Sequence, residues 1–282
     1  MEPVWSLWWV LPAAVGFSTV AVGSGVSGAL FFSPFFMLVV GLTPAQAIGA
    51  GLLTEVFGMG NGLRSYVRQR LVDYATARTL LIGAIPTVVV GAALAHRVPD
   101  STLKIIFGVA LMILATLLIF VPAPEDCEPG AREGTLLRGR ASGKGTTTIR
   151  ARDGTVFEYP TCSRLPGVFL AAIGGGLTGL ISAGLPEIST TQLILRCRIP
   201  PRVAIATSVF TLAITAVVGA AIHALVAESA WGVVVWSVPG VLVGSTLGSQ
   251  VAQHVPSSLM ERVLGVLFVL VGGLVLGLEL LL

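Results

Sequence analysis

Residues 17–36 read FSTVAVGSGVSGALFFSPFF, and residues 173–192 read IGGGLTGLISAGLPEISTTQ. In each stretch, a break rich in small residues interrupts an otherwise apolar segment. The apolar arm after the first break, residues 29–41, would span about 20 Å as a helix, which is shorter than the roughly 30 Å hydrocarbon core of a bilayer. The pattern therefore predicts two broken helical hairpins, either re-entrant or simply kinked around small packing residues.

The composition places these hairpins in a membrane. The chain has 282 residues, of which 54% are apolar and 11% charged, and its mean hydropathy is +0.91. An ordinary soluble domain has about 25% charged residues. These values exclude disorder, a secreted disulfide scaffold and a typical water-soluble enzyme. We expect an all-α polytopic bundle with no enzymatic active site, no cofactor, no metal site and no nucleic-acid partner.

An internal repeat organises the chain. Adding 157 to positions in the first half reaches like residues in the second: Pro44 maps to Pro201, and Val98-Pro99 to Val255-Pro256. Gly83 and Gly91 likewise map to Gly240 and Gly248. We therefore divide the chain into a first transmembrane repeat (1–121), an insertion (122–164) and a second repeat (165–282). Each repeat is predicted to hold one broken hairpin and three spanning helices.

The basic residues predict the orientation. Of the 17 Lys and Arg residues, 15 lie in one set of loops, and the opposite set holds only Arg97 and Lys104. This asymmetry places residues 122–164 in the cytoplasm and both termini outside. The two repeats then face opposite ways in the plasma or inner membrane, as in many secondary transporters.

The insertion contains a predicted β-hairpin. Residues 146–160, TTTIRARDGTVFEYP, place an Asp153-Gly154 turn between alternating side chains. Cys127 and Cys162 flank this segment. We expect them to be unpaired thiols, because a cytoplasmic loop is kept reduced.

Two carboxyl groups lie inside apolar segments. Glu55 is far from both ends of the apolar run 46–66, and Glu187 follows Pro186 just after the second break. Ionisable residues within a membrane are costly and are functional candidates by default, so both are predicted to carry a coupling proton. The alternatives are a structural hydrogen bond for Glu55 and helix capping for Glu187.

Hydroxyl and amide side chains gather around the same breaks. A hydroxyl donates to an oxyanion without adding a fixed charge, and a helix start presents free N–H groups to an anion. Hydroxyls also recur at helical spacing along residues 207–215, where they either line a cavity or bond back to their own helix. The predicted substrate-binding residues are Ser24, Ser27, Ser33, Glu187, Ser189, Thr190, Thr191, Gln192, Thr207, Ser208 and Thr211.

Together these stretches resemble the TauE/SafE family of membrane transporters, which is associated with export of sulfite and organosulfonates. The resemblance covers nearly the whole chain except residues 122–164. It rests on the two breaks, on GLTPAQAIGAGL (41–52) with its partner RIPPRVAIATSVF (198–210), and on Asp73-Tyr74, which matches an acidic–aromatic pair of the family.

The sequence departs from the family pattern in two places. The second repeat keeps Trp231 but has Ala230 in place of the acid, and the first break carries Ser24 and Ser27 within the usual glycine run. The resemblance implies proton-driven export of a small sulfur-containing anion, such as sulfite or sulfoacetate, by alternating access at a midplane site. The partners it implies are that anion, protons and the lipid bilayer, with a homodimer as an option.

Two other classes of protein fit parts of the sequence. A passive anion channel would share the same apolar segments and polar breaks. A membrane-embedded sulfur- or thiol-handling protein would use Cys197, whose neighbours Arg196 and Arg198 favour a thiolate. No His or Asp stands near Cys197 in the sequence to complete a nucleophile–base pair.

Overall fold

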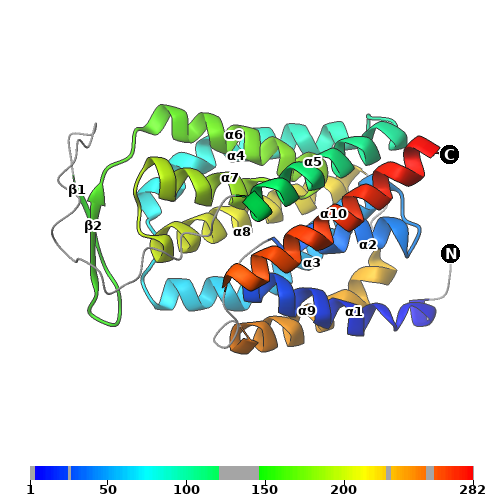
Figure 1. Cartoon of the computed structure of the whole chain (residues 1–282), viewed down its shortest axis with the longest axis horizontal. Helices are drawn as coiled ribbons and strands as arrows, with labels where there is room; N and C mark the ends of the chain where they lie inside the picture. Colours follow the sequence, from blue (N-terminus) through cyan, green and yellow to red (C-terminus); the bar gives the residue numbers. More distant parts are fainter. Residues whose placement is uncertain (1–3, 25–26, 121–145, 227–229, 252–256, 282) are drawn as a thin grey trace.

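The computed structural model describes residues 4–24, 27–120, 146–226, 230–251 and 257–281. It is an elongated helical bundle with a β-hairpin at one end and both chain termini at the other (Figure 1). We call these the hairpin end and the terminal end. A 3₁₀ turn, η1 (Val4–Leu7), precedes the helices, and a π-helical segment, η3 (Gln192–Arg196), follows α7. The helices are α1 (Val10–Ser24), α2 (Ala29–Leu38), α3 (Pro44–Arg68), α4 (Tyr74–Ala95), α5 (Asp100–Phe120), α6 (Arg164–Ile181), α7 (Leu185–Thr191), α8 (Pro201–Val226), α9 (Trp231–Val251) and α10 (Ser257–Leu281).

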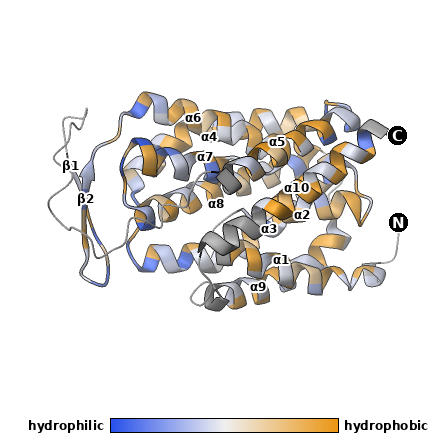
Figure 2. Cartoon of the chain, viewed as in Figure 1, coloured by the Kyte–Doolittle hydropathy of each residue, from blue (hydrophilic) through white to orange (hydrophobic). Residues whose placement is uncertain are grey.

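The helices carry the apolar surface that a bilayer requires. Within the described residues, four are long and apolar enough to cross a membrane: Tyr74–Ala95, Arg164–Ile181, Pro201–Val226 and Trp231–Gly248. Apolar residues dominate the helices, whereas hydrophilic residues concentrate at the hairpin end (Figure 2). The prediction of a polytopic helical membrane protein is therefore confirmed.

Helices from the two halves of the chain pack in reciprocal pairs. α1 packs along α9 and α4 along α6, while α3 packs against α8 and α5 against α10. The starts of α3, α4 and α5 at residues 44, 74 and 100 recur at 201, 231 and 257 for α8, α9 and α10, each 157 residues later. The first helix of the second half, α6, is the counterpart of α1. Exchanging each helix for its counterpart turns the α1–α9 pair into the α6–α4 pair. Counterpart helices of the two halves thus have equivalent neighbours.

Glycines hold the paired helices at close range. A Cβ added at Gly240 would lie 2.7 Å from the backbone oxygen of Leu11 in α1. One added at Gly248 would lie 2.6 Å from the backbone oxygen of Thr19. In the α4–α6 pair, an added Cβ at Gly83 or Gly91 would overlap a backbone oxygen of α6. The glycines that repeat in the sequence therefore mark crossings where the backbones leave no room for a side chain.

Gly175 offers a direct test of this close packing. An added Cβ there would lie 2.7 Å from the Cα of Ala84 in α4. We expect Gly175→Ala to lower the free energy of unfolding by about 1–3 kcal/mol through overpacking, despite the better helix propensity of alanine. Gly273→Ala in α10 is the matched control, because no atom of the described residues lies within 4 Å of its added carbon. Equal melting temperatures for the two variants would contradict the prediction.

The predicted β-hairpin is present. Strands β1 (Thr146–Arg150) and β2 (Val156–Pro160) pair antiparallel, and Gly154 in the turn has a φ of +89°, a conformation that glycine adopts without a Cβ clash. Phe157 and Tyr159 alternate with exposed neighbours and pack on the helices. The hairpin is therefore docked on the bundle through one face.

A buried hydrogen bond anchors that face. The Tyr159 hydroxyl donates to the carboxylate of Asp73 over 3.0 Å, and Asp73 also accepts from the first N–H groups of α4. Burial raises the pKa of the Tyr159 phenol, and the Asp73 carboxylate raises it further, so the phenol remains a donor. The acid that precedes Tyr74 thus caps a helix and holds the hairpin.

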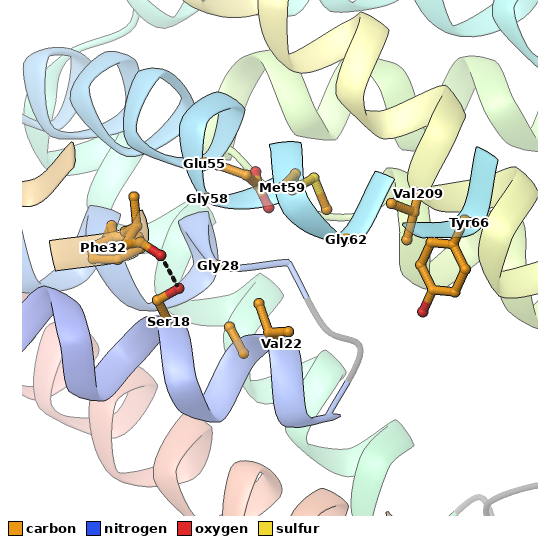
Figure 3. Close-up of a pocket in the computed structure, with 12 residues that line it drawn as sticks. Ser18, Val22, Gly28, Phe32, Glu55, Gly58, Met59, Gly62, Tyr66 and Val209 are labelled. Carbon is orange, nitrogen blue, oxygen red and sulfur yellow. Dashed lines mark hydrogen bonds between the residues drawn. The ribbon is translucent and has the colours of Figure 1, made fainter. Parts of the chain in front are cut away.

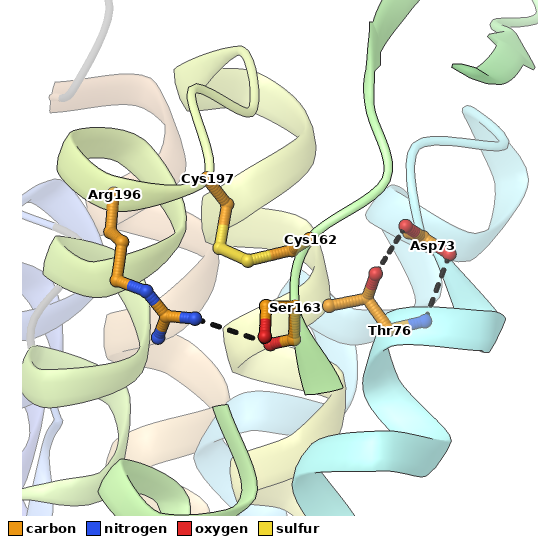
Figure 4. Close-up of a disulfide and its surroundings, with 6 residues drawn as sticks. All are labelled: Asp73, Thr76, Cys162, Ser163, Arg196 and Cys197. Atoms are coloured by element: carbon orange, nitrogen blue, oxygen red, sulfur yellow. Dashed lines mark hydrogen bonds between the residues drawn. A yellow bond between two sulfur atoms is a disulfide. The ribbon is translucent and has the colours of Figure 1, made fainter. Parts of the chain in front are cut away.

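A disulfide supplies a second anchor (Figure 4). Cys162, just after β2, is bonded to Cys197 at the end of η3, and their Cα atoms are 5.2 Å apart. The prediction that Cys162 is an unpaired thiol is wrong, because its partner comes from a part of the chain 35 residues away. Cys127 lies outside the described residues. In this bonded state Cys197 has no free thiol.

The disulfide closes a loop of 35 residues. In the chain-entropy account, a loop of this size contributes about 3–4 kcal/mol to stability. We expect dithiothreitol to lower the melting temperature of the wild type to that of the Cys162→Ser/Cys197→Ser variant, and to leave the variant itself unchanged. A wild-type melting temperature that stays constant after full reduction would contradict this contribution.

Candidate functional site

The two predicted breaks are real interruptions of the helices. α1 ends at Ser24 and α2 begins at Ala29, while α6 ends at Ile181 and α7 begins at Leu185. The second break turns on Ser182 and Gly184, whose φ values are +60° and +116°. These left-handed positions end α6 and redirect the chain into α7. α2 then runs towards the terminal end and α7 lies nearer the hairpin end (Figure 1).

The two breaks meet inside the bundle. The hydroxyl of Ser33 in α2 lies 2.6 Å from the hydroxyl of Ser182. Ser182 donates its proton to the carbonyl of Ile181 over 2.6 Å, so Ser33 is the donor between the two serines. Both side chains are buried. A direct hydrogen bond thus joins segments that are 149 residues apart in the chain.

Glu55 in α3 projects into the first break. Its Oε1 accepts a hydrogen bond of 2.6 Å from the Ser27 hydroxyl, and the backbone N–H groups of Gly28 and Ala29 lie close to this carboxyl. The side chain is almost fully buried, with 2% of its surface exposed. The start of α2 therefore presents its free N–H groups to a carboxyl group of the protein itself.

Glu187 holds the second break in the same manner. It lies in the first turn of α7 and its Oε2 accepts from the N–H of Gly184 over 3.0 Å. The backbone N–H of Ser27 lies near the Glu187 carboxyl, while the Ser27 hydroxyl donates to Glu55. One oxygen of each carboxyl, Oε2 of Glu55 and Oε1 of Glu187, is buried without a hydrogen-bond partner among the described residues.

A small cavity reaches the Glu55 carboxyl. Its volume is about 70 Å³, enough for water or a small ion. It runs along α3 from Glu55 past Gly58, Met59 and Gly62 to Tyr66 near the hairpin end (Figure 3). Its walls are mainly apolar, so the carboxyl is its principal charged group. The cavity connects the site towards one end of the bundle.

The other predicted site residues fall into three groups. Ser189, Gln192 and Ser208 are buried and have polar atoms without a partner in the described part of the chain. The hydroxyls of Thr207 and Thr211 donate to carbonyls of their own helix, and Thr207 also accepts from the N–H of Asp73. Thr190 is partly buried and Thr191 is exposed, while the side chain of Ser24 lies outside the described residues.

Comparison with known proteins identifies the family. The sequence profile of the family described as "Sulfite exporter TauE/SafE" matches residues 10–275, nearly the whole chain. The chain belongs to the TauE/SafE family. It is therefore a multi-pass membrane protein of a transporter family, and the predicted resemblance is confirmed.

Curated relatives agree with this assignment. The chain is 26% identical to the probable membrane transporter protein YunE of Bacillus subtilis over 205 residues, which is 72% of this chain and 71% of that protein. It is 30% identical to the probable membrane transporter protein ORF9 of Sinorhizobium over 96 residues, 34% of this chain and 37% of that protein. No solved structure matches the chain significantly.

The TauE/SafE chain also contains a histidine pair that sequence reasoning missed. Nε2 of His96, after α4, lies 2.9 Å from Nδ1 of His223 in α8, and Nε2 of His223 lies 2.9 Å from the backbone oxygen of Gly179 in α6. Because a carbonyl only accepts, His223 donates from Nε2, and its Nδ1 accepts from His96. Nothing in the sequence connects two histidines 127 residues apart.

The histidine pair predicts an order of stabilities. His223→Ala leaves the Gly179 carbonyl unpaired near the end of α6, where such a loss costs about 1–3 kcal/mol. His96→Ala removes only the outer, less buried ring and should cost less. Melting temperatures of the two variants in detergent measure this order. The arrangement would be contradicted if His96→Ala were as destabilising as His223→Ala.

Proposed function

We propose that this chain is a secondary transporter built from two inverted repeats that alternate access around the joined breaks. The reciprocal helix pairs and the recurrence of helix starts 157 residues apart support a twofold relation between the halves. The opposite directions of α2 and α7 support broken hairpins that enter from opposite ends, an arrangement associated with midplane substrate sites.

The contacts of Glu55 and Glu187 carry the mechanism that we propose. The starts of α2 and α7, which suit an anion, are filled by these carboxyls. A substrate anion and an ionised carboxylate would therefore compete for the same N–H groups and for the Ser27 hydroxyl. Protonation of a carboxyl weakens its hold on these donors and frees them for the substrate.

This competition has a consequence for coupling. The anion binds best when the carboxyl is protonated, so a proton and an anion would occupy the same state and move in the same direction. Movement of one proton with a monovalent anion is electroneutral. Export would then follow the combined concentration gradients of substrate and protons without a contribution from the membrane potential, which differs from the proton-driven export that the family resemblance implies.

The substrate class that we propose is a small sulfur oxyanion or organosulfonate, such as sulfite or sulfoacetate, moved outward. The family description supports this class. The donors at the site support it as well, because hydroxyl and backbone N–H groups complement tetrahedral and pyramidal oxyanions. Ser189, Gln192 and Ser208, with their unpaired polar atoms, are the further candidates for substrate contacts.

The proposed location is the plasma or inner membrane, with the hairpin end in the cytoplasm and both termini outside. Arg64, Arg68 and Arg152 lie at the hairpin end, and Arg97 lies at the opposite end, as expected for a positive cytoplasmic face. In that orientation the Cys162–Cys197 bond faces a reducing compartment, where thiols are the normal state.

Transport in liposomes tests the carboxyl mechanism. We expect Glu55→Gln and Glu187→Gln each to lower the rate of sulfite transport driven by a pH gradient at least about tenfold. Both variants should retain exchange of sulfite for sulfite, because exchange does not require the release of a proton. Glu158→Gln in the exposed face of the hairpin is the control and should behave as wild type.

Proton movement, recorded with an entrapped pH indicator, should accompany sulfite in the same direction in the wild type. Full pH-dependent transport in both glutamine variants would overturn the mechanism. Proton movement opposite to sulfite would overturn the competition between carboxylate and anion. Transport that does not saturate with sulfite would favour the channel alternative.

A further inference from the structure

A second concave site lies at the hairpin end, apart from the helix breaks. It has a volume of about 350 Å³ and is lined by Arg64, Ser65, Arg68 and Gln69 of the α3 end and by Arg152 of the hairpin turn. Three guanidinium groups from two separate elements thus surround one pocket. Pockets of this size hold small organic ligands.

The geometry of the chain fixes the arginines around this pocket. Arg64 and Arg68 are four residues apart on α3, so they share one face of the helix. The backbone N–H of Arg152 donates to the backbone oxygen of Gln69 over 3.0 Å, which ties the hairpin turn to the end of α3. The third arginine is therefore held beside the other two by a backbone contact.

The acidic groups that the structure describes at this end are engaged elsewhere. Asp153, next to Arg152, accepts from the N–H of Thr155 and lies 3.6 Å from Arg202. The Thr155 hydrogen bonds, and then Arg202, lower the pKa of Asp153, which keeps it ionised in those contacts. Asp73 is occupied by Tyr159 and the start of α4. Glu158 lies on the exposed face of β2.

The arginines themselves have no ion pair in the described part of the structure. Two like charges four residues apart destabilise a helix unless a counter-ion lies between them. The asymmetry of charge across the membrane explains why basic residues occur at this end. It does not require three of them to converge on one pocket that is lined by no carboxylate of the described residues.

We propose that this pocket binds a phosphate-ester group. Arginine presents paired N–H donors that match phosphate oxygens, and Ser65 and Gln69 add neutral donors on the same rim. The headgroup of an anionic lipid and a soluble organophosphate share this chemistry. A bound phosphate would bridge α3, which carries Glu55, and the hairpin.

Binding to the purified full-length chain, stripped of lipid in detergent, tests this site. The lipid probes are phosphatidylglycerol and phosphatidylcholine, and the soluble probes are glycerol 3-phosphate and sulfite. The variants are Arg64→Gln/Arg68→Gln and, separately, Arg152→Gln. Arg78→Gln is the matched control, because Arg78 is an exposed arginine of α4 that does not line the pocket.

The expected result is that phosphatidylglycerol or glycerol 3-phosphate raises the melting temperature of the wild type and of Arg78→Gln. Each pocket variant should bind the same probe at least about tenfold more weakly while retaining the wild-type elution profile. A response to phosphatidylglycerol alone assigns the site to a lipid headgroup, and a response to glycerol 3-phosphate assigns it to a soluble ligand.

Three results would overturn the proposal. They are the absence of binding by every phosphate-containing probe, equal binding by the pocket variants and the control, and binding of sulfite alone at these arginines. The last result would place the pocket on the substrate path. None of them bears on the roles of Glu55 and Glu187, which are measured by transport.

Discussion

The Ser27 hydroxyl in the first break donates to the buried carboxyl of Glu55 in α3, and the arrangement of the bundle follows from that contact. A carboxyl group inside a membrane protein needs hydrogen-bond donors, and a continuous helix has none to offer in its middle. A broken helix has the opposite problem, since its first N–H groups lack acceptors. The start of α2 with Glu55, and the start of α7 with Glu187, satisfy each other's requirement.

The need to bring both breaks to one place constrains the other helices. α3 must deliver Glu55 beside α2, and the long pairs α1–α9 and α4–α6 must approach closely enough for the breaks to touch. Glycine at the crossings allows this approach, because any side chain there would meet the opposing backbone. Close packing of helix backbones does not by itself fix how far one helix is shifted along another. Polar contacts such as Ser33–Ser182 therefore set the register between the halves.

The hairpin end shows a different way of joining distant segments. Asp73 caps α4 and accepts from Tyr159, and the disulfide joins the segment after β2 to the end of η3. The hairpin therefore contacts loops of both halves at the end towards which the Glu55 cavity extends. Through Gln69, Arg202 and Cys197 the hairpin segment joins the ends of α3, α8 and η3 at that end.

The sequence by itself determined the membrane character, the positions of the breaks, the 157-residue spacing and the hairpin, because each depends on local composition or periodicity. It also singled out Glu55 and Glu187, since a charge in an apolar run is visible without a structure. Three features were decided only by the tertiary structure: the Ser27–Glu55 hydrogen bond, the Cys162–Cys197 bond and the His96–His223 pair. These features join residues that are distant in the chain. Which helices pack together decides the partner of each polar side chain, and no local sequence pattern contains that information.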